Sequence, residues 1–266
     1  MLDQITPGLL TYNEEQNIGR TLSRLAWAKD IVVVDSGSTD GTLAVLAKFP
    51  KVRVFNRRFE THGNQWRYAT QETKIATEWL LRLDADYQVS DALTAELARL
   101  DPNAAVSAYR VRFDYAVFSR KLLSSLYPSK AILLRKGCFS VWDKGHSDAW
   151  DVQGHVVTLN GTIIHDDWKP ISHWLAGEAQ CLQRELDWIR ARKAGLVRWL
   201  RVRPPLMPIA VFLYCLFGKG LILNGRAGLF YALQRMVAEA VLSLMVLEEK
   251  LRDHAAQVAR PASEDY

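Results

Sequence analysis

The sequence predicts an α/β fold, in which a mostly parallel, doubly wound mixed sheet is followed by a C-terminal helical extension. Over residues 1–168, short runs rich in β-branched residues alternate with amphipathic helical segments, which predicts the sheet. A change of composition after Pro204 predicts the extension. With 266 residues, 49% hydrophobic and 24% charged, the chain can form one large domain and an appendage. This balance excludes disordered, collagenous and polytopic membrane proteins.

Apolar periodicity predicts the first elements. A helix opens at residues 13–16 with an Asn cap, acids in its first turn and Gln at the capping-box position. Its apolar stripe is Ile18, Leu22 and Leu25. Residues 31–35 form a continuous β-branched run, as expected for a parallel strand buried on both faces. Further elements are expected at residues 52–55 (strand), 65–76 (helix) and 79–84 (strand).

The later elements follow a different pattern. Residues 109–115 alternate apolar with charged side chains, which predicts a half-exposed strand. Residues 156–159 and 162–165 flank Asn160-Gly161, a dipeptide typical of a two-residue hairpin turn. A mixed sheet with an antiparallel extension is therefore expected. A long amphipathic helix is predicted over residues 170–193, with Gly195 as its stop.

We place the domain boundary at residue 195, so that residues 1–195 form the α/β domain and residues 196–266 form a helical, membrane-associating segment. Residues 204–218 carry no charge, but these 15 residues include three prolines and are short for a spanning helix. Residues 227–247 are mostly apolar, with a narrow polar stripe of Arg235, Glu239 and Ser243. The favoured interpretation is a helical pair lying in the membrane interface. A hairpin packed on the first domain and a true spanning segment are the alternatives.

The net charge of +5 comes from one local cluster of cations. Six Lys and Arg residues and no acid lie between Arg190 and Arg203, and without those six the net charge is 5 − 6 = −1. Because the cluster directly precedes the most apolar stretch, it suits an anionic membrane surface better than a nucleic acid. Three distant cysteines and an N-terminus without a basic, apolar leader predict a reducing, cytoplasmic location.

Acidic residues end two of the predicted strands. Asp35 follows the run 31–34, and Asp84 follows 79–83. The carboxyl ends of parallel strands form one edge of an open sheet, where ligands bind, so both carboxylates are expected there. A single strand-end Asp is more often a turn or cap residue, but the loop 36–42 after Asp35 is small, flexible and rich in hydrogen-bond donors.

The sequence Asp84-Ala85-Asp86 is a sharper feature of the same edge. Residues two apart on a strand share a face, so the two carboxylates are expected to point together. Two ionised carboxylates at that distance repel each other unless a cation lies between them. A divalent ion with hard oxygen ligands, Mg²⁺ or Mn²⁺, would remove the conflict, and an ordinary surface turn is the alternative.

Taken together, these segments resemble the family 2 glycosyltransferases, which are inverting enzymes with a GT-A fold. Later segments resemble the branch of bacterial lipopolysaccharide-core β-glucosyltransferases. The likeness covers roughly residues 5–190, with the segments in the same order. The segments that carry it are Thr11-Tyr-Asn-Glu-Glu15, Val34 to Thr42, Leu83 to Tyr87, Phe59 to Trp66, Gly145-His-Ser-Asp148 and His165 to Ser172.

The resemblance implies a donor site for a nucleotide sugar. Tyr12, Asn13 and Glu14 would border the base and ribose, and Asp35 would contact the uracil. Gln65 would close over the nucleotide. Relatives commonly have Asn at the position of Arg67, which puts a nucleotide contact there in doubt.

The resemblance also implies the reacting groups. Asp84 would contact the ribose or the metal, and Asp86 would hold Mn²⁺ or Mg²⁺ against the diphosphate. His165 would reach the metal or the diphosphate, and Asp148 would be the catalytic base. Many relatives have Glu where this chain has Asp148, which shortens the reach by one methylene.

The implied activity is transfer of a sugar, such as glucose, from a UDP-sugar to a lipid-linked glycan such as lipopolysaccharide core. It would take place at the cytoplasmic face of the inner membrane; the oligomeric state is not predicted. A non-catalytic, glycosyltransferase-like membrane assembly protein is the main alternative. A glycoside hydrolase is disfavoured because Asp84 and Asp86 share one strand face, whereas a hydrolase needs carboxylates on both sides of the sugar.

Overall fold

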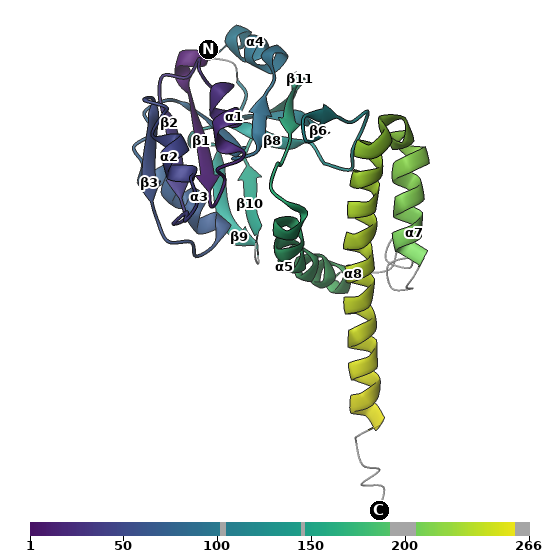
Figure 1. The fold of residues 1–266 in the computed structure, drawn as a ribbon. Coiled ribbons are helices and arrows are strands. Elements are labelled where there is room, and N and C mark those ends of the chain that lie inside the picture. Colours follow the sequence, from purple (N-terminus) through teal and green to yellow (C-terminus); the bar gives the residue numbers. More distant parts are fainter. Residues whose placement is uncertain (102–104, 145–146, 192–205, 259–266) are drawn as a thin grey trace, which may run out of the picture. The chain divides into compact units, whose positions relative to one another are not determined.

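The computed structural model describes residues 1–101, 105–144, 147–191 and 206–258 (Figure 1). The chain divides into two compact units, Met1–Pro170 and Ile171–Tyr266. The boundary predicted at residue 195 lies outside the described residues, and the helix predicted before it belongs to the second unit.

The first unit is built on a mixed sheet with the strand order β3-β2-β1-β4-β8-β6-β11-β5. Strands β1 to β4, β6 and β11 run in one direction, and β5 and β8 run against them. This arrangement confirms the predicted mostly parallel mixed sheet. The strands are β1 (Ile5–Thr11), β2 (Ile31–Asp35), β3 (Val52–Asn56), β4 (Trp79–Asp84), β5 (Tyr87–Val89), β6 (Ala108–Val117), β7 (Arg120–Lys121), β8 (Lys130–Arg135) and β11 (Val156–His165).

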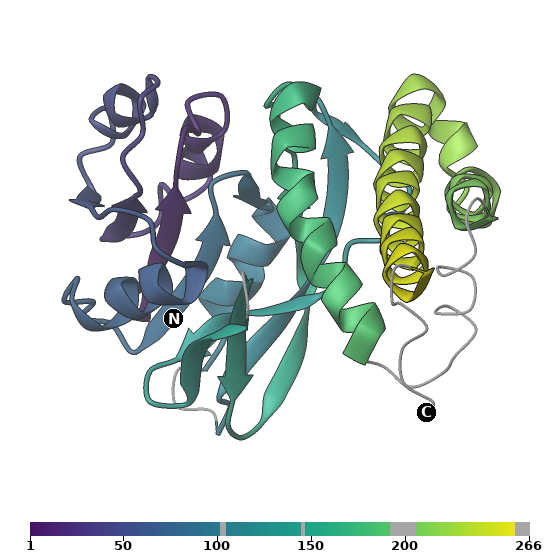
Figure 2. The same ribbon diagram turned by 90° about the horizontal axis from the view of Figure 1, so that it is seen from below.

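A separate two-stranded ribbon and several helices complete this unit. Strands β9 (Phe139–Lys144) and β10 (Ser147–Val152) pair with each other, and Figure 2 shows them as a ribbon distinct from the main sheet. The helices are α1 (Ile18–Ser23), α2 (Thr42–Leu46), α3 (His62–Gln71) and α4 (Asp91–Arg99). All five residues of β2 are buried, as expected for a central parallel strand.

Helix α1 begins later than predicted. Asn13 does not cap it, because Asn13 has a φ of 53° and its side-chain oxygen accepts the backbone N–H of Thr39 at 2.8 Å. The helix begins after Asn17 instead, and the predicted apolar stripe of Ile18, Leu22 and Leu25 is buried. Residues 13–16 are therefore a loop at the carboxyl end of β1.

The hairpin predicted at Asn160-Gly161 is wrong. Both residues lie inside the single strand β11, which pairs in parallel with β6 and has a register shift between Thr158 and Thr162. The Glu96 carboxylate of α4 accepts the backbone N–H groups of Asn160, at 3.0 Å, and Gly161, at 2.7 Å. A Cβ on Gly161 would lie 2.4 Å from the Cα of Leu93. The glycine therefore allows α4 to lie against the strand at a bulge and makes no turn.

The second unit is helical. Helix α5 (Ile171–Ala191) matches the prediction over 170–193, and Gly195 lies outside the described residues. After α7 (Leu206–Leu213), a π-helical turn (Tyr214–Gly218) and a 3-10 turn (Leu221–Asn224) lead into α8 (Gly225–Val258). Helix α5 packs on α8 through Leu182, Leu186, Ala238, Leu242 and Val246.

The predicted polar stripe of α8 lies on or beside this packed face. Ser243 is 5% exposed, and Arg235 lies 3.9 Å from Glu178 of α5. Large apolar side chains are exposed elsewhere on the segment, including Phe217, Leu223, Leu244 and Leu251. Within the described residues, the segment Leu221–Ala255 is long and apolar enough to cross a membrane, judged by length and composition.

Candidate active site

Asp35 and Asp84 lie at the same edge of the sheet, on either side of β1. The register pairs Thr11 of β1 with Asp35 and Leu10 with Asp84. The two carboxylates that sequence reasoning placed together are therefore separated by one strand. Because β1 lies between β2 and β4, the loop that follows β1 begins between Asp35 and Asp84.

Asp35 organises the loop that follows it. Its side chain is fully buried and accepts hydrogen bonds from the Thr11 hydroxyl at 3.1 Å and from the backbone N–H groups of Gly37 and Ser38, both at 2.9 Å. The Ser38 hydroxyl also accepts the backbone N–H of Asn13 at 2.9 Å. The loops after β1 and β2 are thus joined at the edge of the sheet. Beside this junction, Tyr12 is 53% exposed.

Gln65 is fully buried on α3. Its amide nitrogen donates to the Ser36 hydroxyl at 2.9 Å and to the Arg57 carbonyl at 3.0 Å, and its oxygen accepts from the Arg57 guanidinium at 2.8 Å. Gln65 therefore holds the loop after β2 from the inside. Arg67 faces another way, because its guanidinium donates to Asn64 and to the Val141 carbonyl of β9.

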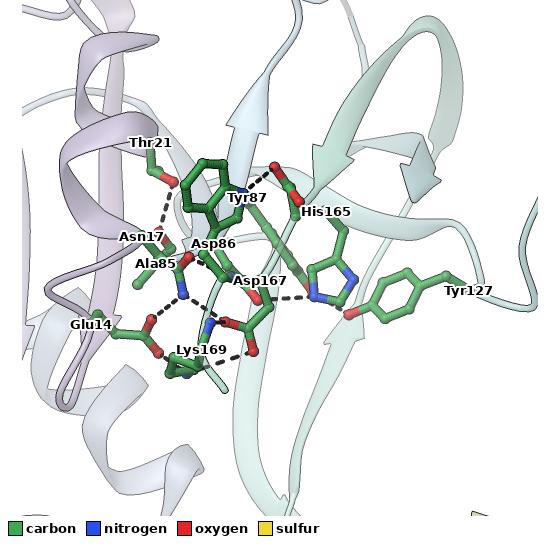
Figure 3. Close-up of polar contacts among 12 residues, drawn as sticks. Glu14, Asn17, Thr21, Ala85, Asp86, Tyr87, Tyr127, His165, Asp167 and Lys169 are labelled. Carbon is green, nitrogen blue, oxygen red and sulfur yellow. Dashed lines mark hydrogen bonds and ion pairs between the residues drawn. The ribbon is translucent and has the colours of Figure 1, made fainter. Parts of the chain in front are cut away.

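Asp86 and His165 are in direct contact (Figure 3). His165 is the last residue of β11 and pairs with Tyr87 of β5, immediately after Asp86 in the sequence. Its Nε2 lies 2.9 Å from Oδ2 of Asp86, and each side chain is 14% exposed. Burial lowers the pKa of His165, but the Asp86 and Asp84 carboxylates raise it by more, so its net pKa is above the usual value.

Lys130 and two tyrosines form a hydrogen-bonded group near Asp84, the other carboxylate of the Asp84–Asp86 turn. The Lys130 ammonium donates to the hydroxyls of Tyr87, at 2.8 Å, and Tyr127, at 2.7 Å. Burial raises the pKa of Asp84, but the Lys130 and Arg82 cations and a hydrogen bond from Tyr87 bring it below its usual value. The Tyr127 ring also lies against His165, with the ring centroids 4.6 Å apart.

Glu14 is the acid of a second buried cluster at this edge. Its Oε1 lies 2.5 Å from Nζ of Lys169, and its Oε2 accepts from the Asn17 amide at 2.9 Å (Figure 3). The same amide donates to Asp167 at 2.7 Å. Burial raises the pKa of Glu14, Lys169 lowers it and nearby Asp86 raises it, with a net value of about 7. A carboxyl group that titrates near neutral pH therefore lies beside the Asp86–His165 pair.

The segment after His165 connects this cluster to α1. Asp166 is buried and forms an ion pair with Arg20 at 2.7 Å, and its backbone N–H donates to the Asp86 carbonyl at 3.2 Å. The Trp168 indole N–H donates to the Asp166 carboxylate at 2.9 Å, and the Arg20 guanidinium lies over the Trp168 ring at 4.5 Å. The segment therefore fixes His165 and Lys169 relative to the Asp84–Asp86 turn.

The structure places Asp148 by its backbone alone. Asp148 lies in β10 opposite Asp143 of β9; its side chain, and Gly145 and His146, lie outside what the structure describes. Two residues farther along β10, the Trp150 ring lies 5.4 Å from the Trp66 ring of α3, and Arg82 of β4 lies 4.7 Å over it. The ribbon that carries Asp148 is therefore packed against α3 and against Arg82 of β4, and Arg82 lies two residues before Asp84.

The donor set fits a divalent ion that also binds phosphate. Within the described ranges, no three His, Cys, Asp or Glu side chains form a set suited to hold a metal ion by themselves. Mg²⁺ and its relatives are usually held by one or two carboxylates, with substrate phosphates completing the coordination. Asp86 and His165 supply an oxygen and a nitrogen donor in contact, and Nδ1 of His165 is buried without a hydrogen-bond partner among the described residues.

Sequence reasoning missed several members of this site. Tyr87 directly follows Asp86, and Asp166, Asp167 and Lys169 lie one to four residues after His165, so closeness in sequence to a predicted site residue was their signal. Tyr127 and Lys130 have no such signal, because only the pairing of β8 with β4 brings them to the site.

A family model described as glycosyl transferase family 2 matches residues 9–153, which contain both sheet-edge aspartates and the ribbon β9–β10. The chain belongs to this family. Membership, together with the mixed and mostly parallel sheet, confirms the predicted GT-A type of fold.

Two curated glycosyltransferases are similar in sequence. The lipopolysaccharide core biosynthesis glycosyltransferase LpsC of Rhizobium meliloti is 29% identical over 96 residues, 35% of this chain and 35% of LpsC. An uncharacterised glycosyltransferase of Rickettsia conorii is 29% identical over 98 residues, 36% of this chain and 34% of that protein. The matched segment thus spans about a third of each relative. The similarity to LpsC confirms the predicted resemblance to the lipopolysaccharide-core branch.

Solved structures show a more distant likeness. S. aureus TarS (residues 1–349) aligns with a TM-score of 0.46 at 14% identity, covering 92% of each chain. Glucosyl-3-phosphoglycerate synthase from Mycobacterium tuberculosis, in complex with Mn²⁺, UDP and phosphoglyceric acid, aligns with a TM-score of 0.44 at 15% identity. That alignment covers 68% of this chain and 78% of the synthase.

Proposed function

We propose that this family 2 glycosyltransferase moves a hexose such as glucose from a UDP-sugar to a lipid-linked glycan, with lipopolysaccharide core as the favoured acceptor class. The observation that carries the proposal is the contact between Asp86 and His165 at the carboxyl edge of the sheet. The similarity to LpsC supports the acceptor class. The family supports transfer from an activated sugar.

The nucleotide would bind over the joined loops after β1 and β2. Tyr12 is exposed there and suits a contact with the base, with Asn13 and Glu14 toward the ribose. Asp35 is proposed for the uracil through the loop that it orders, and Gln65 acts on the same loop through Ser36. Backbone N–H groups of such a loop are suited to approach a polar ligand closely.

The Asp84–Asp86 turn would meet the ribose and the diphosphate. Asp84 is proposed to contact the ribose or the metal. Asp86 and His165 are proposed to bind the metal. When bound, Mn²⁺ or Mg²⁺ stabilises the negative charge that develops on the leaving diphosphate. The end of β11 and the segment after it hold the side chains of Asp86 and His165 in one place.

Asp148 is the proposed base. A carboxylate on the acceptor side of the sugar would take the proton of the attacking hydroxyl as that oxygen bonds to the anomeric carbon. The bond to the diphosphate breaks on the opposite side, so one displacement inverts the anomeric centre and needs no covalent enzyme intermediate. The packing of Trp150 against Trp66 and Arg82 supports a fixed position for the ribbon that carries Asp148.

The second unit is proposed to hold the enzyme at the cytoplasmic face of the inner membrane. Around α7 and α8, large apolar side chains are exposed: Phe217 is 64%, Leu223 79% and Leu244 64% exposed. Within the apolar part of α8, Arg235 lies 3.9 Å from Glu178 of α5 and Ser243 is buried. This distribution suits an apolar surrounding, and the preceding cation cluster suits anionic lipid headgroups.

Turnover of UDP-glucose with a truncated lipopolysaccharide core tests the proposal. We expect UDP release that requires the acceptor and a divalent ion and that stops in Asp86→Ala. UDP-dependent Mn²⁺ binding without any transfer to a panel of glycolipid acceptors would favour the non-catalytic assembly protein. Transfer from a different nucleotide sugar, and not from a UDP-sugar, would overturn the proposed identity of the donor.

A further inference from the structure

A two-residue turn projects from the carboxyl edge of the sheet. Strands β6 and β7 form a hairpin, and Phe118 and Ser119 are the two residues between them. Tyr115 of β6 lies in register with His165 of β11. Because each residue of a strand advances the chain by about 3.3 Å, the turn begins roughly 10 Å along the strand beyond the level of His165. The turn therefore stands out past the candidate metal site.

The backbone of this turn is strained. Phe118 has a φ of 46° and Ser119 has a φ of 64°, and two-residue turns with positive φ at both positions usually contain Asn or Gly. A bulky apolar residue in this conformation is costly. The side chain of Phe118 is nevertheless 50% exposed, so packing in the core does not account for it. The turn holds an aromatic ring at the surface at the expense of backbone strain.

The buried carboxylate of Asp166 fixes the turn. Its two oxygens accept the backbone N–H of Ser119, at 3.1 and 3.2 Å, and the same carboxylate forms the ion pair with Arg20. Asp166 directly follows His165, and its own backbone N–H donates to the Asp86 carbonyl at 3.2 Å. The turn is therefore fixed relative to the two residues that are proposed to bind the metal.

Exposed apolar side chains continue after the turn. Leu123 is 65% exposed and Leu126 is 39% exposed. Leu122 lies between Phe118 and these two leucines and is buried, and its backbone N–H donates to the Tyr115 carbonyl at 2.8 Å. Leu122 thus anchors the segment to the sheet, while the apolar side chains on either side of it face outward.

The charges around these side chains are positive. Residues 118–130 contain three cations and no acid. Lys121 forms an ion pair with Asp114 at 2.7 Å, and Arg120 is exposed beside it on β7. Exposed apolar side chains that are flanked by cations suit the interface of an anionic bilayer, where the apolar groups enter the acyl boundary and the cations meet the headgroups.

We propose that residues 118–126, the membrane tip, insert Phe118, Leu123 and Leu126 into the surface of an anionic membrane. This inference deepens the proposed function and rests on it for the lipid-linked acceptor. Contact of the membrane tip with lipid brings the carboxyl edge of the sheet to the bilayer in which the acceptor is embedded. The contact belongs to the first unit and adds to the one proposed for α7 and α8.

Co-sedimentation of the full-length protein with phosphatidylglycerol vesicles, titrated over lipid concentration, tests the inference. Phe118→Asn removes the ring and supplies a residue that suits positive φ, and Leu123→Gln removes the most exposed leucine of the membrane tip. We expect this double variant to bind vesicles about tenfold more weakly, because two apolar side chains no longer leave water. The matched control changes Leu43 and Val54, which are 41% and 42% exposed elsewhere on the first unit, to Gln and should bind as the wild type does.

Turnover supplies a second readout. In the double variant, kcat/KM for a glycolipid acceptor embedded in the vesicles should fall together with vesicle affinity. The kcat/KM for the same glycan released from its lipid should stay at the wild-type value, because the membrane tip touches lipid and takes no part in the reaction. An equal loss with both acceptors would assign the membrane tip to the active site and overturn the inference.

The vesicle measurement also separates this inference from the proposed function. Wild-type vesicle affinity in the double variant would overturn the inference, and a lower unfolding free energy in addition would assign the exposed side chains to a contact between protein surfaces. Wild-type protein that transfers no sugar to either acceptor would overturn the proposed function. In that case weaker vesicle binding by the double variant would still support the membrane tip.

Discussion

The Nζ atom of Lys169 lies 2.5 Å from Oε1 of Glu14, although the two residues are 155 positions apart in the chain. This ion pair joins the loop after β1 to the segment after β11. Both side chains are largely buried, 15% and 13% exposed. The ion pair therefore connects the carboxyl ends of β1 and β11, the first and last parallel strands along the chain. The charge of Glu14 and the charge of Lys169 stabilise each other there.

The first prediction concerns the pH dependence of stability. The pKa of Glu14 is raised from 4.5 to about 7. The folded protein thus keeps a proton that the unfolded chain has released above pH 4.5, so the Glu14 contribution to the unfolding free energy falls as pH rises from about 4.5 to 7. Glu14→Gln should remove this decline. Urea unfolding at pH 5 and pH 7.5 measures it, with the exposed Glu72→Gln as control. An identical pH slope in wild type and Glu14→Gln would contradict the prediction.

The second prediction concerns the proposed base. Asp148→Asn should lower kcat by about 10²–10⁴-fold, because proton removal from the acceptor hydroxyl is lost. Binding of UDP with Mn²⁺ should stay at the wild-type value, which calorimetry measures. Asp151→Asn, an exposed aspartate on the same strand, is the matched control and should keep its turnover. A kcat of Asp148→Asn close to wild type would remove Asp148 from the mechanism.

A third prediction concerns the support of the ribbon β9–β10. Trp150→Ala removes the contacts with Trp66 and Arg82 and should lower the unfolding free energy by about 2–3 kcal/mol. It should also lower kcat more than it raises the KM for the UDP-sugar, because the acceptor side is disturbed and the donor loops are not. Trp142→Ala, on the other strand and 44% exposed, should change both much less. Equal effects of the two substitutions would argue against a supporting role for Trp150.

The fourth prediction tests the proposed membrane attachment. Arg198, Arg201 and Arg203 belong to the cation cluster and lie outside the described residues. Changing all three to Gln should weaken binding to vesicles of anionic lipid by about 1 kcal/mol per cation, on the order of a hundredfold in partitioning. Co-sedimentation measures the bound fraction, with Arg99, Arg110 and Arg112, three exposed arginines of the first unit, changed to Gln as control. Equal retention of both triple variants would exclude the electrostatic contribution.

Local sequence predicted the parts of the fold that depend on local periodicity. The run at residues 31–35 is a buried central strand because a continuous apolar segment of that length has few other solutions. The positions of Asp35 and Asp84 followed from the same logic, since each ends such a strand. The resemblance to the family implied that Asp86 and His165 would both lie near the metal, and in the structure the two side chains are in contact.

The features that local sequence did not predict depend on distant partners. Asn160-Gly161 has the chemistry of a turn, but Glu96 of α4 takes up its backbone N–H groups and keeps the strand continuous. Asn13 resembles a helix cap, but Thr39 of another loop occupies its side chain. Lys130 comes to the end of β4 only through the pairing of β8 with β4, which no pattern near either strand reports.

Calorimetry of UDP binding with and without Mn²⁺ tests the central claim most directly, on wild-type protein, Asp86→Ala and the exposed control Asp91→Ala. We predict that Mn²⁺ strengthens UDP binding in the wild type and in Asp91→Ala and that Asp86→Ala loses this gain, because Asp86 and His165 hold the ion against the diphosphate. UDP affinity that is insensitive to Mn²⁺, or a full gain in Asp86→Ala, would contradict the assignment of the donor site.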